Sequence, residues 1–400
     1  MPVIKIKQTL RFSDFDRYYE ELNSFNNASE KLDLELPTQV SKSFFSITSS
    51  LIQFAASWLR TDYYGKLLVD LTNEPLAIQK MYEEEFFFPI VALAWNDIQI
   101  VNLEGLNMRP VLRDYQNDFI LKMRRILPLK GEKLLLVNLD HFSNNNGILP
   151  FFETKNQSPT SEISLLDSLR LPVINSVLKY SNQNKNEFLT IFNDIAAIIY
   201  ELMKNTFEWA KTDENGLPLS PNVRGLYIRF YKKTRALLLS DYEKNKPIHQ
   251  YFSDDTTLQT NETGQIYFIE ISVFDSGVGF VRKFRDDDIQ PLNDIEIIKK
   301  CLIKNQTSDT GVFKDKKGIG LDRILRTLDK KGFLRIKTDK YCLYRNMIES
   351  PYQELQKQDF RMVELNDWYT QKPDEFTTTP FSSGSNISIL YPLSIKPYTK

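Results

Sequence analysis

The chain has 400 residues, 42% apolar and 26% charged, and its 51 basic and 52 acidic side chains leave a formal net charge of −1. This composition indicates a globular protein, gives no bulk positive charge for binding nucleic acid, and at this length favours two domains. Two cysteines, Cys301 and Cys342, are too few for a disulfide framework. No apolar leader core and no uninterrupted apolar run of about eighteen residues occurs, so we expect a cytoplasmic protein without membrane spans.

The first 150 residues alternate short apolar runs with helical patterns. Four runs are typical of strands: Val3–Arg11, Leu32–Leu36, Lys66–Leu71 and Lys133–Leu139. The last two have the composition of central strands, and Ser43–Arg60 has the periodicity of a helix. The alternation predicts a smaller α/β domain over residues 1–150. Because this half has no glycine-rich loop, paired histidines or Ser-His-Asp pattern, we interpret it as a regulatory or partner-binding domain of unknown family.

The stretch Asn144–Pro159 is polar and rich in turn residues, which makes it the best candidate for a domain boundary. A second domain is therefore predicted over residues 160–400. It begins with a helical pattern at Ile163–Tyr180, and Pro172 predicts a break after Leu171.

A long amphipathic helix is predicted over Phe188–Lys211, where apolar residues recur at helical spacing. Glu201 and Asn205 are four residues apart, so they lie on one face and can act on one ligand. Taken alone, Asn205 is equally a helix-face amide and Glu201 an ordinary surface acid.

Two runs after this helix, Gly225–Tyr231 and Ala236–Leu239, are predicted to form a strand pair, and the polar segment Asp241–Gly264 a surface loop. A stronger strand signal follows at Tyr267–Phe280, which is rich in β-branched and aromatic residues.

This strand ends in Asp275, Gly277 and Gly279. Glycines allow a bound molecule to approach the backbone closely, and a carboxylate at the strand end can accept a hydrogen bond from an amine. An ordinary strand-to-turn exit would give the same short motif.

The following segment, Arg282–Lys317, has a helical pattern at Asn293–Lys304 and a polar, glycine-containing part at Asn305–Lys317. The composition of this last part suits a mobile loop that is ordered by a ligand. Gly318 and Gly320 then precede a helix, and a glycine-rich helix entry offers free N–H groups to a phosphate. Lys316 and Lys317 add charge there, or form a solvated lysine pair.

The chain closes with two strands, an insertion and a further strand. The strands are predicted at Phe333–Thr338 and Tyr341–Tyr344, the polar insertion spans Glu349–Ser383, and the final run is Gly384–Pro392, GSNISILYP.

In this order, four of these segments resemble the GHKL ATPases, the Bergerat-fold family of gyrase, the large heat-shock chaperones, MutL and histidine kinases. ELMKN at Glu201–Asn205 resembles the N-box, and DSGVG at Asp275–Gly279 the first glycine box. GIGL at Gly318–Leu321 resembles the second glycine box, and GSNISILYP the last strand. The resemblance covers roughly residues 185–392 and implies an α/β sandwich with a mixed sheet and helices on one face.

The resemblance also implies roles for single residues. Asp275 would accept the adenine amine, Asn205 would ligate Mg²⁺, and Glu201 would activate the attacking water. The remaining residues implied in ATP binding are Gly277, Gly279, Lys317, Gly318, Ile319, Gly320, Leu321 and Ser385. The sequence departs from the family pattern at Glu208 and Trp209, which stand where an Asp and a small residue are usual.

These roles imply an Mg-ATP-binding, slowly hydrolysing ATPase that acts as a nucleotide-driven switch. We expect a protein partner or a homodimer, because the gyrase, MutL and chaperone types complete their site from a further domain. Glu201 favours hydrolysis over phosphotransfer, since histidine kinases usually lack an acid at this position. A protein kinase of the anti-sigma or two-component type, acting on serine or histidine, and a non-catalytic nucleotide sensor remain the alternatives.

Overall fold

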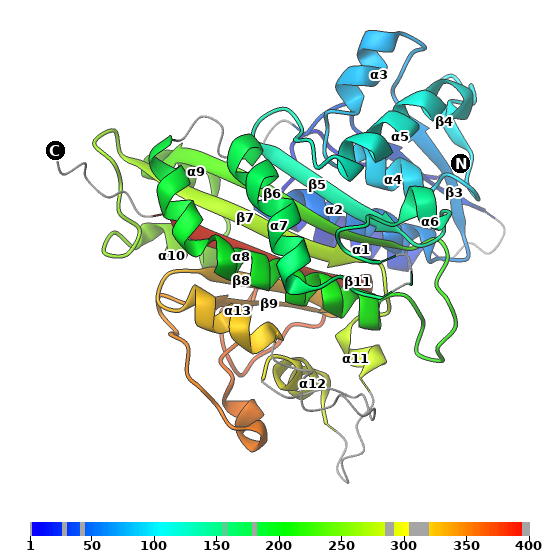
Figure 1. Cartoon of the computed structure of the whole chain (residues 1–400). Coiled ribbons are helices and arrows are strands. Elements are labelled where there is room, and N and C mark those ends of the chain that lie inside the picture. The colour runs from blue at the N-terminus through cyan, green and yellow to red at the C-terminus, as the bar shows by residue number, and fades with distance from the viewer. Residues whose placement is uncertain are drawn as a thin grey trace.

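The computed structural model describes residues 2–25, 30–40, 45–154, 156, 158–177, 182–284, 292–303 and 320–393. Its strands form two sheets, a four-stranded sheet in the order β1-β2-β3-β4 and a seven-stranded sheet in the order β10-β9-β8-β11-β7-β6-β5. In Figure 1 the long strands of the second sheet cross the centre of the molecule, and the first sheet lies beside the N-terminus. The predicted α/β class is confirmed.

The first sheet is parallel throughout. Its strands are β1 (Val3–Lys5), β2 (Leu32–Leu36), β3 (Tyr64–Val69) and β4 (Ile100–Asn102). The helices of this half are α1 (Phe12–Ser24), α2 (Ile47–Leu59), α3 (Pro75–Met81), α4 (Phe87–Leu93), α5 (Arg109–Arg124) and α6 (Asn144–Gly147). Strand β1 is shorter than the predicted Val3–Arg11. Asp14 accepts the backbone N–H of Arg11 at 2.9 Å, so the start of α1 is capped there.

The second sheet is antiparallel at every described pairing, which corrects the predicted mixed sheet. Its strands are β5 (Lys133–Leu139), β6 (Val223–Thr234), β7 (Gln265–Asp275), β8 (Phe333–Asp339), β9 (Tyr341–Asn346), β10 (Asn366–Asp367) and β11 (Ser382–Leu393). The last strand, β11, lies between β7 and β8 and runs antiparallel to both. Strand β10 belongs to the polar insertion Glu349–Ser383, so part of this insertion extends one edge of the sheet beside β9.

Strand β5 belongs to the second sheet, although the sequence grouped Lys133–Leu139 with the first domain as a central strand. It pairs with β6 from Lys133 opposite Arg229 to Leu139 opposite Val223, and it forms the sheet's other edge. The apolar run identified the strand but not its partner, because pairing depends on contacts distant in sequence. A division at residue 150 therefore separates β5 from its sheet.

Helices cover both faces of the second sheet, where the sequence predicted one. On one face lie α7 (Glu162–Pro172), α8 (Asn182–Trp209) and α13 (Gly320–Leu328), which stand in front of the strands in Figure 1. On the opposite face lies α2, which contacts β7 and β11. Among the described residues, no helix combines the length and the apolar character needed to cross a bilayer.

The structure tests the predictions for three single segments of the chain. Helix α7 includes Pro172 and passes directly into a π-helical turn, η1 (Val173–Val177), so the predicted break after Leu171 is a change of helix type and not an end. Ala236–Leu239 is part of α9 (Arg235–Asp241) rather than a strand, because the Thr234 side chain accepts the N–H of Leu237 and caps a helix. The expected surface loop contains α10 (Lys246–Ser253), whose Ile248, Tyr251 and Phe252 are buried.

The remaining elements are α11 (Phe280–Lys283), α12 (Asp294–Cys301) and a 3₁₀ helix, η3 (Lys357–Met362). Helix α12 confirms the helical pattern predicted for this part of the chain. The polar segment Asn305–Lys317, predicted to be a ligand-ordered lid, lies outside the described residues.

Candidate functional site

Asp275 lies at the end of β7, an interior strand that is hydrogen-bonded to β6 and β11. Its Oδ1 accepts the backbone N–H of Gly277 at 2.9 Å and of Ser385 at 3.3 Å. No hydrogen bond to Oδ2 is found among the described residues, although the side chain is only 8% exposed. A buried carboxylate therefore retains one oxygen that can accept a hydrogen bond from a ligand.

Burial also sets the charge of this carboxylate. Removal from water raises the pKa of Asp275 to about 7, against the lowering effect of the two backbone N–H groups and of Arg224. Nearby Asp339 raises the pKa further, because two like charges repel. A ligand that donates a hydrogen bond to Asp275 would stabilise the ionised form.

Two glycines let the chain turn tightly around Asp275. Gly279 has φ +87°, and a Cβ there would lie 2.4 Å from a carboxylate oxygen of Asp339. Gly384 has φ +72°, and a Cβ there would lie 1.9 Å from the backbone oxygen of Asp275. Neither position accepts a side chain without displacement of the acid beside it.

A small cavity of about 30 Å³, partly open to solvent, lies between α8 and the sheet at this strand end. It is lined by Leu202, Asn205, Thr206, Trp209, Ala210, Val273, Asp275, Gly279, Phe280, Ser385 and Ile387. The structure thus brings together Asn205, Asp275, Gly279 and Ser385, which were selected from three separate stretches of sequence. Gly277 packs against the residue that follows α8, since a Cβ on it would lie 2.8 Å from Cα of Ala210.

Asn205 and Glu201 differ in their relation to this cavity. Asn205 is half-buried, lines the cavity, and makes no side-chain hydrogen bond among the described residues. Glu201, one turn earlier on α8, is half-buried but does not line the cavity. Burial raises the pKa of the Glu201 carboxyl, while the charges of Lys204 and Arg323 oppose that rise.

The predicted phosphate-binding residues are only partly visible. Lys317, Gly318 and Ile319 lie outside the described residues. Gly320 is the first residue of α13, as expected for a glycine at a helix start. Leu321 is a core side chain with 7% exposure and does not line the cavity.

Sequence reasoning missed two polar residues at the end of β8. The Thr338 hydroxyl lies 3.0 Å from that of Ser385 and accepts the N–H of Phe280 at 3.1 Å. Asp339 accepts the N–H of Val281 at 3.2 Å, and burial raises the pKa of this carboxyl to about 6. Their position in the chain gave no signal, because β8 reaches the site only by pairing with β11.

Among the described residues, the donor set of this cavity offers Mg²⁺ a single side-chain ligand. Within the described part of the chain, no group of three or more His, Cys, Asp or Glu side chains could hold a metal ion. The free amide oxygen of Asn205 is a suitable single ligand, since Mg²⁺ usually keeps several waters and binds substrate phosphates.

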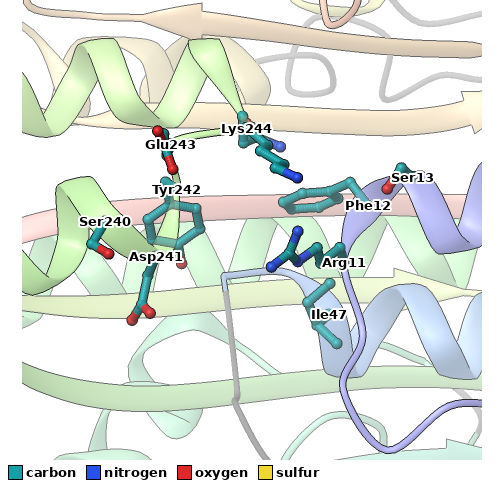
Figure 2. A pocket seen from close by; sticks show the side chains of 10 residues that line it. Arg11, Phe12, Ser13, Ile47, Ser240, Asp241, Tyr242, Glu243 and Lys244 are labelled. Atoms are coloured by element: carbon teal, nitrogen blue, oxygen red, sulfur yellow. The ribbon is translucent and has the colours of Figure 1, made fainter.

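A second cavity lies between the start of α1 and the connection from α9 to α10. In Figure 2 the cationic groups of Arg11 and Lys244 lie on opposite sides of the Phe12 ring, with Tyr242 facing them. None of the predicted site residues lines this cavity.

Comparison of the chain with protein-family models, with curated proteins and with solved structures finds no match in any of the three. The family resemblance drawn from the motifs stays a prediction.

Proposed function

We propose that the chain binds Mg-ATP in the cavity beside Asp275, hydrolyses it slowly, and acts as a nucleotide-driven switch with a protein partner or a second copy of itself. One observation carries the proposal: a single cavity gathers Asn205, Asp275, Gly279 and Ser385. The resemblance to the GHKL ATPases implies a role in nucleotide binding for all four.

The lining of the cavity, rather than its size in this structure, suits an adenine. Its walls include the apolar side chains of Leu202, Val273 and Ile387, which can pack on the faces of a flat ring. At its end the free Oδ2 of Asp275 offers an acceptor to an exocyclic amine. The protein would thus supply one charged acceptor within an apolar slot.

Asn205 and Glu201 would act at the phosphate end. Asn205 would hold Mg²⁺, which when bound neutralises phosphate charge. Glu201 would accept a proton from water, and burial favours this role because it raises the pKa of the carboxyl toward the working pH. Since Glu201 does not line the cavity, its approach to the phosphates would require nucleotide-dependent rearrangement.

The test is a calorimetric titration with ATP and Mg²⁺ of wild type, Asp275→Asn and Asp255→Asn. Asp275→Asn should weaken binding by about tenfold or more, because an unpaired buried amine costs about 1–3 kcal/mol. Asp255 is an exposed acid outside the cavity, so its variant should bind as wild type does. Equal affinity in all three proteins would contradict the proposal.

A non-catalytic nucleotide sensor is the second candidate, favoured by the position of Glu201 away from the cavity lining. It predicts ATP binding without turnover. A hydrolysis assay on purified protein, alone and with its genomic partners, distinguishes the two functions.

A further inference from the structure

Helix α2 carries a stripe of polar residues that faces the second sheet. The stripe consists of Ser46, Ser50, Gln53, Ser57 and Arg60, spaced three or four residues apart, and we call it the polar stripe. A polar stripe on an amphipathic helix normally faces water. Here every residue of α2 is buried, and the other sides of the helix belong to the core of the N-terminal half. Trp58 ties the helix to β2 by donating its indole N–H to the carbonyl of Leu32 at 2.7 Å.

The N-terminal part of the polar stripe contacts side chains of the sheet. The backbone N–H of Ser46 donates to Glu270 at 2.8 Å, and its hydroxyl accepts from Arg335 at 2.9 Å. Ser50 contacts the amide of Asn386 at 3.3 Å. These contacts fix the helix on the sheet but do not reach the cavity.

The C-terminal part of the polar stripe contacts backbone atoms next to Asp275. The Gln53 amide nitrogen lies 3.2 Å from the carbonyl oxygen of Ser383 and 3.3 Å from that of Gly384. The Ser57 hydroxyl accepts the N–H of Ser383 at 2.8 Å. Arg60 donates to the carbonyl of Ser276 at 3.3 Å. The contacted residues lie within two positions of Asp275 or Ser385 in the chain.

Those two backbone segments set the direction of the Asp275 carboxylate. Ser385 and Gly277 donate the N–H groups that occupy Oδ1, so their positions decide where Oδ2 points. Gly384 packs directly against the backbone oxygen of Asp275. A shift of α2 would therefore rotate or displace the acceptor on which base recognition depends.

We propose that Gln53, Ser57 and Arg60 are positioning residues for the nucleobase, and that α2 couples the N-terminal half of the chain to the nucleotide site. This inference rests on the proposed function, since it concerns the same carboxylate. None of the three side chains lines the cavity, so each acts through the backbone that holds Asp275.

The test compares ATP with inosine triphosphate, which carries a carbonyl in place of the exocyclic amine. At pH 8, where Asp275 is ionised, wild type should bind ATP more tightly than inosine triphosphate. Gln53→Met keeps the side-chain length and removes the donor. It should weaken ATP binding about tenfold and change the affinity for inosine triphosphate by less than about threefold. The matched control is Gln116→Met, the same change at a buried position of α5, and it should leave the ratio of the two affinities unchanged.

A merely structural role for Gln53 would weaken both nucleotides equally and keep the ratio, and that result would overturn the inference. Ser57→Ala removes the acceptor for the N–H of Ser383, together with the donor to the carbonyl of Gln53 within the same helix. It provides the same comparison if Gln53→Met does not fold. Failure of wild type to bind either nucleotide would refute the proposed function itself. Preference of wild type for ATP, with the ratio unaltered in the variants, would refute the positioning role alone.

Discussion

Asp275 combines burial with an oxygen that accepts no hydrogen bond from the described residues. Two N–H groups hold Oδ1, while Oδ2 remains available at the cavity. Water exclusion makes this carboxylate costly to ionise in the folded chain. The residue is therefore poised to bind a donor ligand at the expense of stability.

The raised pKa of Asp275 predicts a pH dependence of stability. Between about pH 4 and pH 7 the folded state holds a proton on this group that the unfolded state has released, so the free energy of unfolding should fall as pH rises. Asp275→Asn lacks this titrating group, so its free energy of unfolding should not show this fall. The stability of the variant relative to wild type should therefore be higher at pH 8 than at pH 5, by up to a few kcal/mol. Urea unfolding at both pH values measures it, and an identical pH slope in the two proteins would contradict the shift.

Glu201 and Asn205 should separate in their effects on catalysis and binding. Glu201→Ala should keep ATP affinity and lose turnover by about 10²–10⁴-fold, the usual contribution of a positioned general base. Asn205→Ala should lose turnover and, in addition, the Mg²⁺ dependence of ATP binding, because Asn205 lines the cavity. Titrations with and without Mg²⁺, together with hydrolysis rates, test both variants. Unchanged turnover in Glu201→Ala would favour the sensor function.

At the scale of elements, the start of β11 packs directly against the Asp275 backbone, so the path of this strand and the geometry of the site depend on each other. Gly384 has a left-handed backbone and no room for a side chain, because it packs against Asp275. Gly384 lies in an irregularity of the β11–β8 pairing between Ser382 and Ser385, just before the residues of β11 that pair with β7. The packing of β11 at Gly384 therefore also fixes the position of the Asp275 carboxylate.

Gly384→Ala should consequently destabilise the protein more than the same change at Gly216. Both glycines have positive φ, +72° and +85°, but a Cβ at Gly216 would meet no atom within 4 Å. Gly216→Ala should cost about 1–2 kcal/mol from the backbone alone, and Gly384→Ala about 1–3 kcal/mol more from the overlap. Chemical unfolding of both variants gives the difference. Equal losses would show that β11 relaxes away from Asp275.

At the scale of the whole molecule, the two sheets are joined by shared elements and not by a linker. Strand β5 precedes the predicted boundary but pairs with β6, and α2 belongs to the N-terminal core but covers the second sheet. A buried ion cluster adds to this. Arg224 of β6 is fully buried and bonds Asp140 at 2.6 Å and Glu153 at 2.5 Å, both of which precede residue 160.

A fragment of residues 160–400 should therefore not fold on its own. It would lack β5, α2 and both carboxylates that neutralise Arg224, and loss of a partner from a buried ion pair costs about 3–5 kcal/mol. We expect a cooperative thermal transition for the full chain and none for the fragment, measured by circular dichroism. A cooperatively folding fragment with the ATP affinity of the full chain would contradict this organisation.

The sequence by itself determined the local features of this protein. A run of β-branched and aromatic residues specified β7, helical periodicity specified α8, and the glycines after Asp275 marked a tight turn, because each signal depends on neighbours along the chain. Only the tertiary structure decided that β5 pairs with β6, that Thr338 and Asp339 reach the site, and that the polar stripe of α2 faces the sheet. These are contacts between residues far apart in sequence, and an apolar run or a polar stripe does not specify the surface that will cover it.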